Sequence, residues 1–174
     1  MSCKVALVTG GCRSGKSDHA LQLALNHTRR VFIATAEATD DEMVRRIRCH
    51  QEERGGLFQT VEEPLHLAQA IETVPAGTEV ILIDCLPVWL GNLSHHGRMP
   101  GNEESCAEIE AFIKALASAP CDVIVVTGEI GLGLVPAEAS TRLYRDRLGR
   151  LNRNVATVAD DVYFVVSGLP MKLK

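Results

Sequence analysis

The stretch VALVTGGCRSGKSDHALQLAL, residues 5–25, contains the most informative motif of the chain. A short apolar run leads into GGCRSGKS, residues 10–17, which fits the P-loop pattern G-x-x-x-x-G-K-[ST]. The apolar residues that follow, among them Ala20 and Leu21, have the spacing of a helix. A strand before the glycines and a helix after them argue against a chance match. The stretch therefore predicts a loop whose backbone N–H groups bind the phosphates of a nucleotide.

The P-loop pattern also predicts the residues that act on the phosphates. Lys16 is expected to hold the β- and γ-phosphates, and Ser17 is expected to bind Mg²⁺. An acidic partner for the metal is expected at the end of a buried strand, where VILID, residues 80–84, supplies Asp84. The alternative is that Asp84 caps the following helix. Glu129, which ends VIVVTGE, is a second acidic candidate.

Short runs rich in Val and Ile recur along the chain with helical patterns between them. They begin at Val5, Val31, Val80, Val123 and Val162. Runs that are apolar on both faces and alternate with helices are typical of a mostly parallel sheet that is covered on both sides. We therefore predict an α/β fold, a three-layer P-loop NTPase of the RecA-like type, in which residues 1–174 form a single domain.

The composition argues against several classes of protein. The 174 residues are 46% hydrophobic and 23% charged, which is enough apolar material for one packed domain. A net charge of −4 without a long run of Lys and Arg argues against nucleic-acid partners. No run approaches the length needed to cross a bilayer and no signal peptide is evident, so we expect a cytoplasmic protein. The six cysteines contain no C-x-x-C pair, so neither a disulfide framework nor a zinc site is indicated.

A second functional element is predicted in TDDEMVRRIRCHQEER, residues 39–54. Thr39 and Glu42 form a capping-box pattern, and Gly55 is a common residue just beyond a helix end. The spacing therefore predicts one helix over residues 39–54.

His50 is the candidate nucleophile on this helix. Arg46 and Arg54 each stand four residues away from it, where guanidinium groups can hold phosphate oxygens beside the imidazole. This pattern suggests attack by His50 on phosphorus. The alternative is a solvated basic face with an incidental histidine.

The order of motifs along the chain resembles that of one enzyme family. After the P-loop come FIATAEATDDEM, RIRCH, TVEEP, ILIDCLPVWLGN, VTGEIGLGLVP and the closing GRLNRNVATVADDVYFVVSGLPMKLK. Together they resemble the bifunctional adenosylcobinamide kinase/adenosylcobinamide-phosphate guanylyltransferase family of cobalamin biosynthesis, over nearly the whole chain. The R-I-x-x-H helix and the closing V-S-G-x-P-x-K-x-K are more specific than the P-loop.

The resemblance implies two activities and a set of site residues. A kinase phosphorylates adenosylcobinamide with ATP or GTP and Mg²⁺, and GTP then guanylylates His50 before GMP passes to adenosylcobinamide phosphate. The catalytic residues implied are His50 and Lys16, and the metal ligands are Ser17 and Asp84. A homotrimer is also implied. The nucleotide site implied by the family comprises Gly10, Gly11, Cys12, Arg13, Ser14, Gly15, Lys16, Ser17, Thr35, Ala36, Glu37, Gln51, Glu52, Glu53, Arg54, Glu62 and Asp84.

The chain departs from the family pattern at several positions. RGGLF, residues 54–58, stands where relatives often have R-P-x-x-W. Gly128 stands where they often have Asn, and Cys12 where they often have Ala. Some relatives have a second histidine at the place of Cys49, so here His50 alone is the candidate nucleophile.

Two other functions remain open on the sequence. One is a small-molecule kinase that uses the same P-loop without transferring a nucleotide. The other is a GTP-dependent switch that recruits a partner, against which the missing N-K-x-D motif counts.

Overall fold

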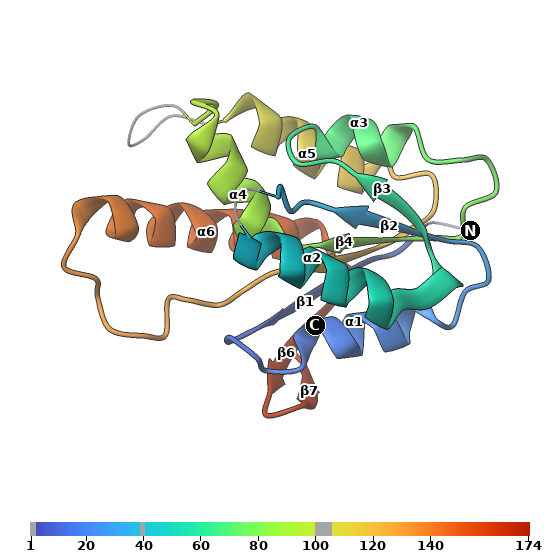
Figure 1. Ribbon diagram of the computed structural model, residues 1–174, viewed down its shortest axis with the longest axis horizontal. Helices are drawn as coiled ribbons and strands as arrows, with labels where there is room; N and C mark the ends of the chain where they lie inside the picture. The colour runs from blue at the N-terminus through green and yellow to red at the C-terminus, as the bar shows by residue number, and fades with distance from the viewer. Residues whose placement is uncertain (1–2, 39–40, 100–105) are drawn as a thin grey trace.

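In the described part of the chain, seven strands form one sheet (Figure 1). The computed structural model describes residues 3–38, 41–99 and 106–174. The strands are β1 (Val5–Gly10), β2 (Arg30–Ala34), β3 (Gln59–Glu62), β4 (Val80–Asp84), β5 (Asp122–Val126), β6 (Asp161–Val166) and β7 (Leu169–Lys172). Their order is β3-β2-β4-β5-β1-β6-β7, and all neighbours are parallel except β6 and β7.

The central strands are buried on both faces, as their continuous apolar runs predicted. In β4, Ile81 and Ile83 belong to one core, whereas Val80 and Leu82 belong to the core on the other side of the sheet. Successive side chains of a strand point to opposite faces, so a strand with a core on each side needs apolar residues at every position.

Helices cover both faces of the sheet. They are α1 (Lys16–Ala24), α2 (Asp41–Arg54), α3 (Leu67–Glu72), α4 (Leu86–His95), α5 (Ala107–Ala117) and α6 (Ala139–Val158), with a 3₁₀ turn η1 (Gly55–Leu57) after α2. Helices α3 to α6 pack on one face, and α1 packs on the other (Figure 1). The predicted three-layer α/β fold is therefore confirmed.

β1, which leads into the P-loop, and β4, which ends in Asp84, are not neighbours in the sheet. β5 lies between β1 and β4 and pairs in parallel with both. A strand inserted at this place gives the sheet its RecA-like arrangement, as predicted. Since the strands from β1 to β6 run in parallel, their carboxyl ends lie at one edge, where open α/β sheets bind their ligands.

Two strands were not predicted from the sequence. β3 is short and mostly exposed, and β7 is exposed at all four residues, so neither has the apolar pattern of a buried strand. The five predicted strands are all present. Trp89 is fully buried against Phe112, with ring centroids 5.0 Å apart.

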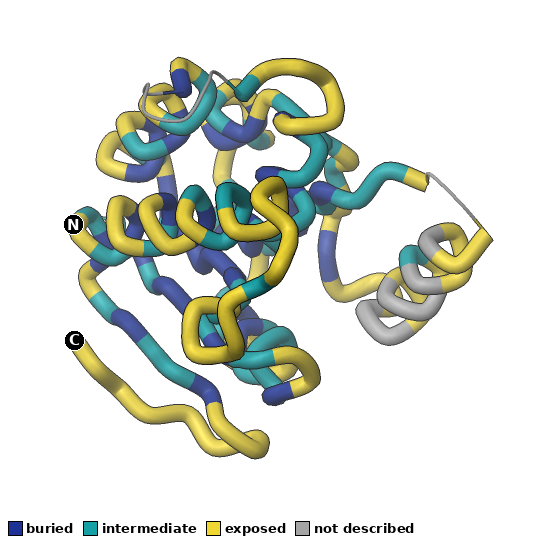
Figure 2. Tube along the Cα trace, turned by 90° about the vertical axis from the view of Figure 1, so that its left-hand side faces the viewer, coloured by how far each residue is buried: buried dark blue, intermediate teal, exposed yellow. Residues whose placement is uncertain are grey.

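Helix α2 lies at the margin of the molecule (Figure 2). Ile47 is half-buried, while Val44, Arg45 and Arg48 are exposed. The helix ends at Arg54, and Gly55 has a φ of +50°, in agreement with its predicted role after the helix end. The predicted cap Thr39 and the side chains of six helix residues lie outside the described part of the structure. These six are Met43, Arg46, Cys49, His50, Glu53 and Arg54.

Candidate active site

The loop between β1 and α1 has the tight geometry that the P-loop pattern requires. A Cβ added to Gly10 would lie 2.5 Å from the carbonyl oxygen of Val165 and 2.6 Å from Ser14 Oγ. Gly15 has a φ of +90° and stands directly before α1. Both positions exclude larger residues, one by close approach and the other by its left-handed backbone.

Lys16 and Ser17 begin α1, as predicted. Lys16 Nζ donates a hydrogen bond to the carbonyl oxygen of Gly11 at 3.2 Å, so the ammonium group lies over the loop. Ser14 is buried, and its hydroxyl has no hydrogen-bond partner among the described residues. Cys12 and Arg13 are exposed, whereas Gly11 is half-buried. A cation, a buried hydroxyl and the start of a helix together form a site for an anion.

Asp84 lies at the same edge of the sheet as Lys16. The pKa of the Cys85 thiol is raised to about 12, first by burial and then by the negative charge of Asp84, while the positive charge of Lys16 acts in the opposite direction. The thiol therefore lies within electrostatic reach of both side chains. The N-cap of α4 is Cys85 and not Asp84, so the reading of Asp84 as a helix cap is wrong.

Thr35 joins the end of β2 to the turn after β4. Its side chain is fully buried, and its hydroxyl accepts a hydrogen bond from the backbone N–H of Cys85 at 2.9 Å. The same hydroxyl lies within donating distance of two carbonyl oxygens, Asp84 O at 3.2 Å and Cys85 O at 3.0 Å. Because the hydroxyl is already engaged, Thr35 is suited to position the turn that carries Asp84.

The next residues of this loop extend toward α4. Ala36 and Glu37 are half-buried. Both carboxylate oxygens of Glu37 lie close to His96 Nε2, at 3.2 and 3.1 Å. His96 therefore holds Glu37 in place, and this contact was not predicted from the sequence.

Gln51 of helix α2 contacts Glu62 at the end of β3, and both residues belong to the predicted site. Gln51 Nε2 donates to Glu62 Oε1 at 3.4 Å. Glu52 pairs with Arg48, one turn earlier, at 3.1 Å. The side chains of His50, Glu53 and Arg54 lie outside the described part of the structure, so their contacts stay predictions.

Two asparagines support the loops at this edge and were not predicted. Asn152 of α6 accepts a hydrogen bond from the Thr127 hydroxyl at 2.7 Å and donates to Gly128 O at 3.0 Å. Asn92 of α4 donates to Thr35 O at 2.7 Å and to Pro64 O at 3.1 Å. Each stands next to a buried leucine in its helix, Leu151 and Leu93. A polar residue beside the buried face of a helix is the sequence signal that would have drawn attention to them.

The donor set at this edge fits Mg²⁺. Ser17 and Asp84 offer a hydroxyl and a carboxylate, and oxygen is the ligand that Mg²⁺ prefers. The buried, unpartnered hydroxyl of Ser14 in the adjacent loop also indicates that a polar ligand belongs there. Among the described residues, no cluster of three His, Cys, Asp or Glu side chains forms a metal cage. Protein sites usually bind Mg²⁺ with one or two carboxylates, water and substrate phosphates.

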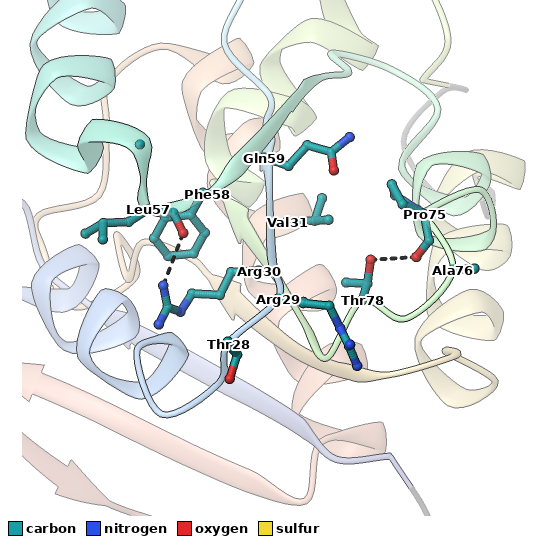
Figure 3. Close-up of a pocket in the computed structure, with 11 residues that line it drawn as sticks. Thr28, Arg29, Arg30, Val31, Leu57, Phe58, Gln59, Pro75, Ala76 and Thr78 are labelled. Carbon is teal, nitrogen blue, oxygen red and sulfur yellow. Dashed lines mark hydrogen bonds between the residues drawn. The ribbon is translucent and has the colours of Figure 1, made fainter.

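A separate pocket lies at the opposite edge of the sheet, near the amino ends of β2, β3 and β4 (Figure 3). Its volume is about 520 Å³. Arg30 donates to Leu57 O at 3.2 Å, and its guanidinium carbon lies 6.0 Å from the centre of the Phe58 ring. Arg29 pairs with Glu79 at 3.1 Å. Because its arginines already have protein partners, this pocket is a poor site for nucleotide phosphates.

Residues 6–173 match the family model described as cobinamide kinase / cobinamide phosphate guanyltransferase. The chain belongs to this family. A bifunctional adenosylcobalamin biosynthesis protein CobP from Pseudomonas aeruginosa is 41% identical over 172 residues, which cover 97% of this chain and 96% of the relative. The protein named CobU from Escherichia coli K12 is 38% identical over 178 residues, 97% of this chain and 98% of its own. The resemblance read from the motifs is thereby confirmed.

The family assignment agrees with the fold. A solved structure from Pyrococcus horikoshii OT3 has a TM-score of 0.51 with 6% sequence identity, and covers 99% of this chain and 86% of its own, which is a likeness of fold alone. Among the helices of the described residues, none combines the length and the apolar character needed to span a membrane. In an enzyme family that acts with nucleotides, the loop of residues 10–17 is the expected phosphate site.

Proposed function

We propose that this protein catalyses two successive reactions on a corrinoid. It phosphorylates adenosylcobinamide with ATP or GTP, and it then transfers GMP from GTP through a guanylylated His50 to give adenosylcobinamide-GDP. The family match over residues 6–173 supports this pair of activities. The observation that carries the proposal is the phosphate loop, in which Gly15 has a left-handed backbone and Lys16 opens α1.

The kinase step requires positioning and neutralisation of charge. The substrate hydroxyl loses its proton to solvent and its oxygen bonds to the γ-phosphorus as the bond between that phosphorus and the bridging oxygen breaks, and ADP or GDP leaves. Lys16, which lies over the loop, stabilises the charge on the transferred group. Mg²⁺ held by Ser17 and Asp84 would supply further neutralisation of the phosphates when bound.

The guanylyl step divides one displacement at phosphorus into two. A ring nitrogen of His50 bonds to the α-phosphorus of GTP, and pyrophosphate leaves. A phosphate oxygen of adenosylcobinamide phosphate then bonds to the same phosphorus, the P–N bond breaks, and His50 is regenerated. The contact between Gln51 and Glu62 supports a place for this helix beside the end of β3. The exposed cation Arg45 supplies positive charge along the helix.

We propose further that the protein works in the cytoplasm as a homotrimer. Leu132 and Leu134, in the loop before α6, are 79% and 96% exposed. Leu169 and Met171 are exposed on β7, the last strand at its edge of the sheet. Exposed apolar side chains and a strand edge support association between copies of the chain. Sedimentation velocity is expected to give the mass of a trimer, and a monomer at micromolar concentration would contradict this part of the proposal.

Covalent labelling tests the guanylyl step. The purified protein is incubated with Mg²⁺ and GTP radiolabelled on the α-phosphate, then denatured and washed with acid. Label that survives denaturation but is lost in acid indicates a phosphoramidate. His50→Ala is expected to lose the label and to keep the kinase activity, whereas His66→Ala, an exposed histidine at the start of α3, keeps both.

The same experiment separates the competing functions. A parent protein that phosphorylates adenosylcobinamide but takes up no label is a kinase without nucleotidyl transfer. A protein that binds GTP and turns over neither substrate without a partner is a switch. Label that persists in His50→Ala places the nucleotide on another residue.

A further inference from the structure

One side of α4 reaches the loops at the carboxyl edge of the sheet. Trp89, Asn92 and His96 are spaced by three and four residues, so they lie on the same side of the helix. Trp89 Nε1 donates to Leu65 O at 2.8 Å, and His96 Nε2 lies 3.1 Å from a carboxylate oxygen of Glu37. Asn92, between them, is the residue that contacts both loops.

The Asn92 carboxamide joins two separate loops with one nitrogen. Its Nδ2 donates to Thr35 O, in the loop after β2, at 2.7 Å and to Pro64 O, in the loop after β3, at 3.1 Å. A primary amide nitrogen has two hydrogens, and a carbonyl oxygen can only accept. The NH₂ group is thus fully used on these two acceptors, and the nitrogen must face them.

Both acceptors lie two residues from a predicted nucleotide contact. Glu37 follows Thr35 by two positions, and Glu62 precedes Pro64 by two. Thr35 also bonds to the turn that carries Asp84. The three loops that carry these carboxylates are therefore connected through Thr35 and Asn92.

We propose that Asn92 is a positioning residue of the nucleotide site, which holds the loop of residues 35–37 and the loop of residues 62–65 at a fixed separation. The inference rests on the proposed function, because contacts of Glu37 and Glu62 with a nucleotide are predicted only for that function. Without the amide, the pairing of β2 with β3 and the bond from Glu63 N–H to Ala34 O remain, but the link between Thr35 and Pro64 is lost. Nucleotide then has to order the two loops when it binds, and this lowers its affinity.

Calorimetric titration tests this role with the α,β-methylene analogue of GTP, which cannot donate GMP. Asn92→Ala is expected to raise the dissociation constant about tenfold, which corresponds to about 1.4 kcal/mol. Asn92→Asp has nearly the same shape but only acceptor oxygens, so its loss is expected to be at least as large. Asn154→Ala, an exposed asparagine on α6, is the matched control and stays within about twofold of the parent.

A double-mutant cycle separates positioning from general stability. Glu37→Gln is expected to weaken binding in the parent and to have a smaller effect in the Asn92→Ala background, because the loop of Glu37 has then lost its bond to Asn92 and keeps only the contact with His96 to α4. Binding is measured where circular dichroism shows every variant to be folded. Dissociation constants within twofold of the parent for both Asn92 variants, or full additivity in the cycle, would overturn the proposal.

Covalent labelling by GTP is measured separately on the same proteins. If the parent binds the analogue but takes up no label, guanylyl transfer fails as a function while the dissociation constants still decide the role of Asn92. If the parent binds no analogue, both proposals are overturned.

Discussion

Gly15 of the phosphate loop packs directly against Gly168, in the turn between β6 and β7. A Cβ added to Gly15 would lie 3.1 Å from the Cα atom of Gly168. The backbone N–H of Gly168 donates to Ser14 O at 2.8 Å. The shape of the phosphate loop therefore depends on a hairpin at the other end of the chain.

Replacing Gly15 by Ala is expected to weaken the binding of both ATP and GTP by at least about tenfold. The new Cβ meets Gly168, and a φ of +90° costs a residue with a side chain about 1–2 kcal/mol. Gly168→Ala is the control, because its φ of +81° carries a similar cost but its Cβ would meet no atom within 4 Å. Nucleotide titrations and urea unfolding check this. Equal nucleotide affinity in both variants would show that the contact between the two glycines has no effect on the loop.

Lys16→Ala is expected to lower the rate of phosphoryl transfer about 10²–10³-fold, the usual loss when one group that stabilises the transition state is removed. Lys114 on α5 is exposed and far along the chain from the loop, so Lys114→Ala serves as the control. Steady-state kinetics with ATP and adenosylcobinamide measure the effect. A variant that keeps more than a tenth of the parent rate would show that Lys16 does not stabilise the transition state.

Thr35→Val removes the hydroxyl but retains the shape of the side chain. The N–H of Cys85 and the nearby carbonyl oxygens then lose a partner in a buried place, which costs about 1–3 kcal/mol of unfolding free energy. Thr35→Ser keeps the hydroxyl and is expected to lose less. Urea unfolding followed by the fluorescence of Trp89 gives both values. Similar losses in the two variants would mean that the methyl group, and not the hydroxyl, stabilises the turn.

Stability is expected to fall as the pH rises above about 9. Burial raises the pKa of the Cys121 thiol from 9.0 to about 11, and it raises those of Cys85 and Tyr144 to about 12. In this range the unfolded chain releases protons that the folded protein retains, so rising pH favours unfolding; the contribution is fully present below about pH 9 and is lost by about pH 12.

Urea midpoints between pH 8 and pH 11 measure this fall. Cys121→Ala removes one of the titrating groups, so its midpoint is expected to decline less steeply than that of the parent. Parallel declines in the two proteins would contradict a contribution from Cys121.

Most of the fold could be predicted because its signals are local. VILID, residues 80–84, alternates between two cores, and a strand buried on both faces shows this as an unbroken apolar run. β7 escaped prediction since it is exposed along its length, where it pairs with β6 at the edge of the sheet. The alternative reading of Asp84 as a helix cap is wrong because the capping position falls one residue later, at Cys85.

The phosphate loop, the α/β layers and the family could be predicted from the sequence alone, because each is encoded by residues close together or by motifs in a fixed order. Which loops meet at the carboxyl edge became known from the three-dimensional structure. Thr35 and Cys85 are 50 residues apart, and Asn92 lies 57 residues from Thr35. Their contacts depend on the order in which the strands pair. That order is fixed by packing over the whole sheet, so it cannot be predicted from a local pattern of residues.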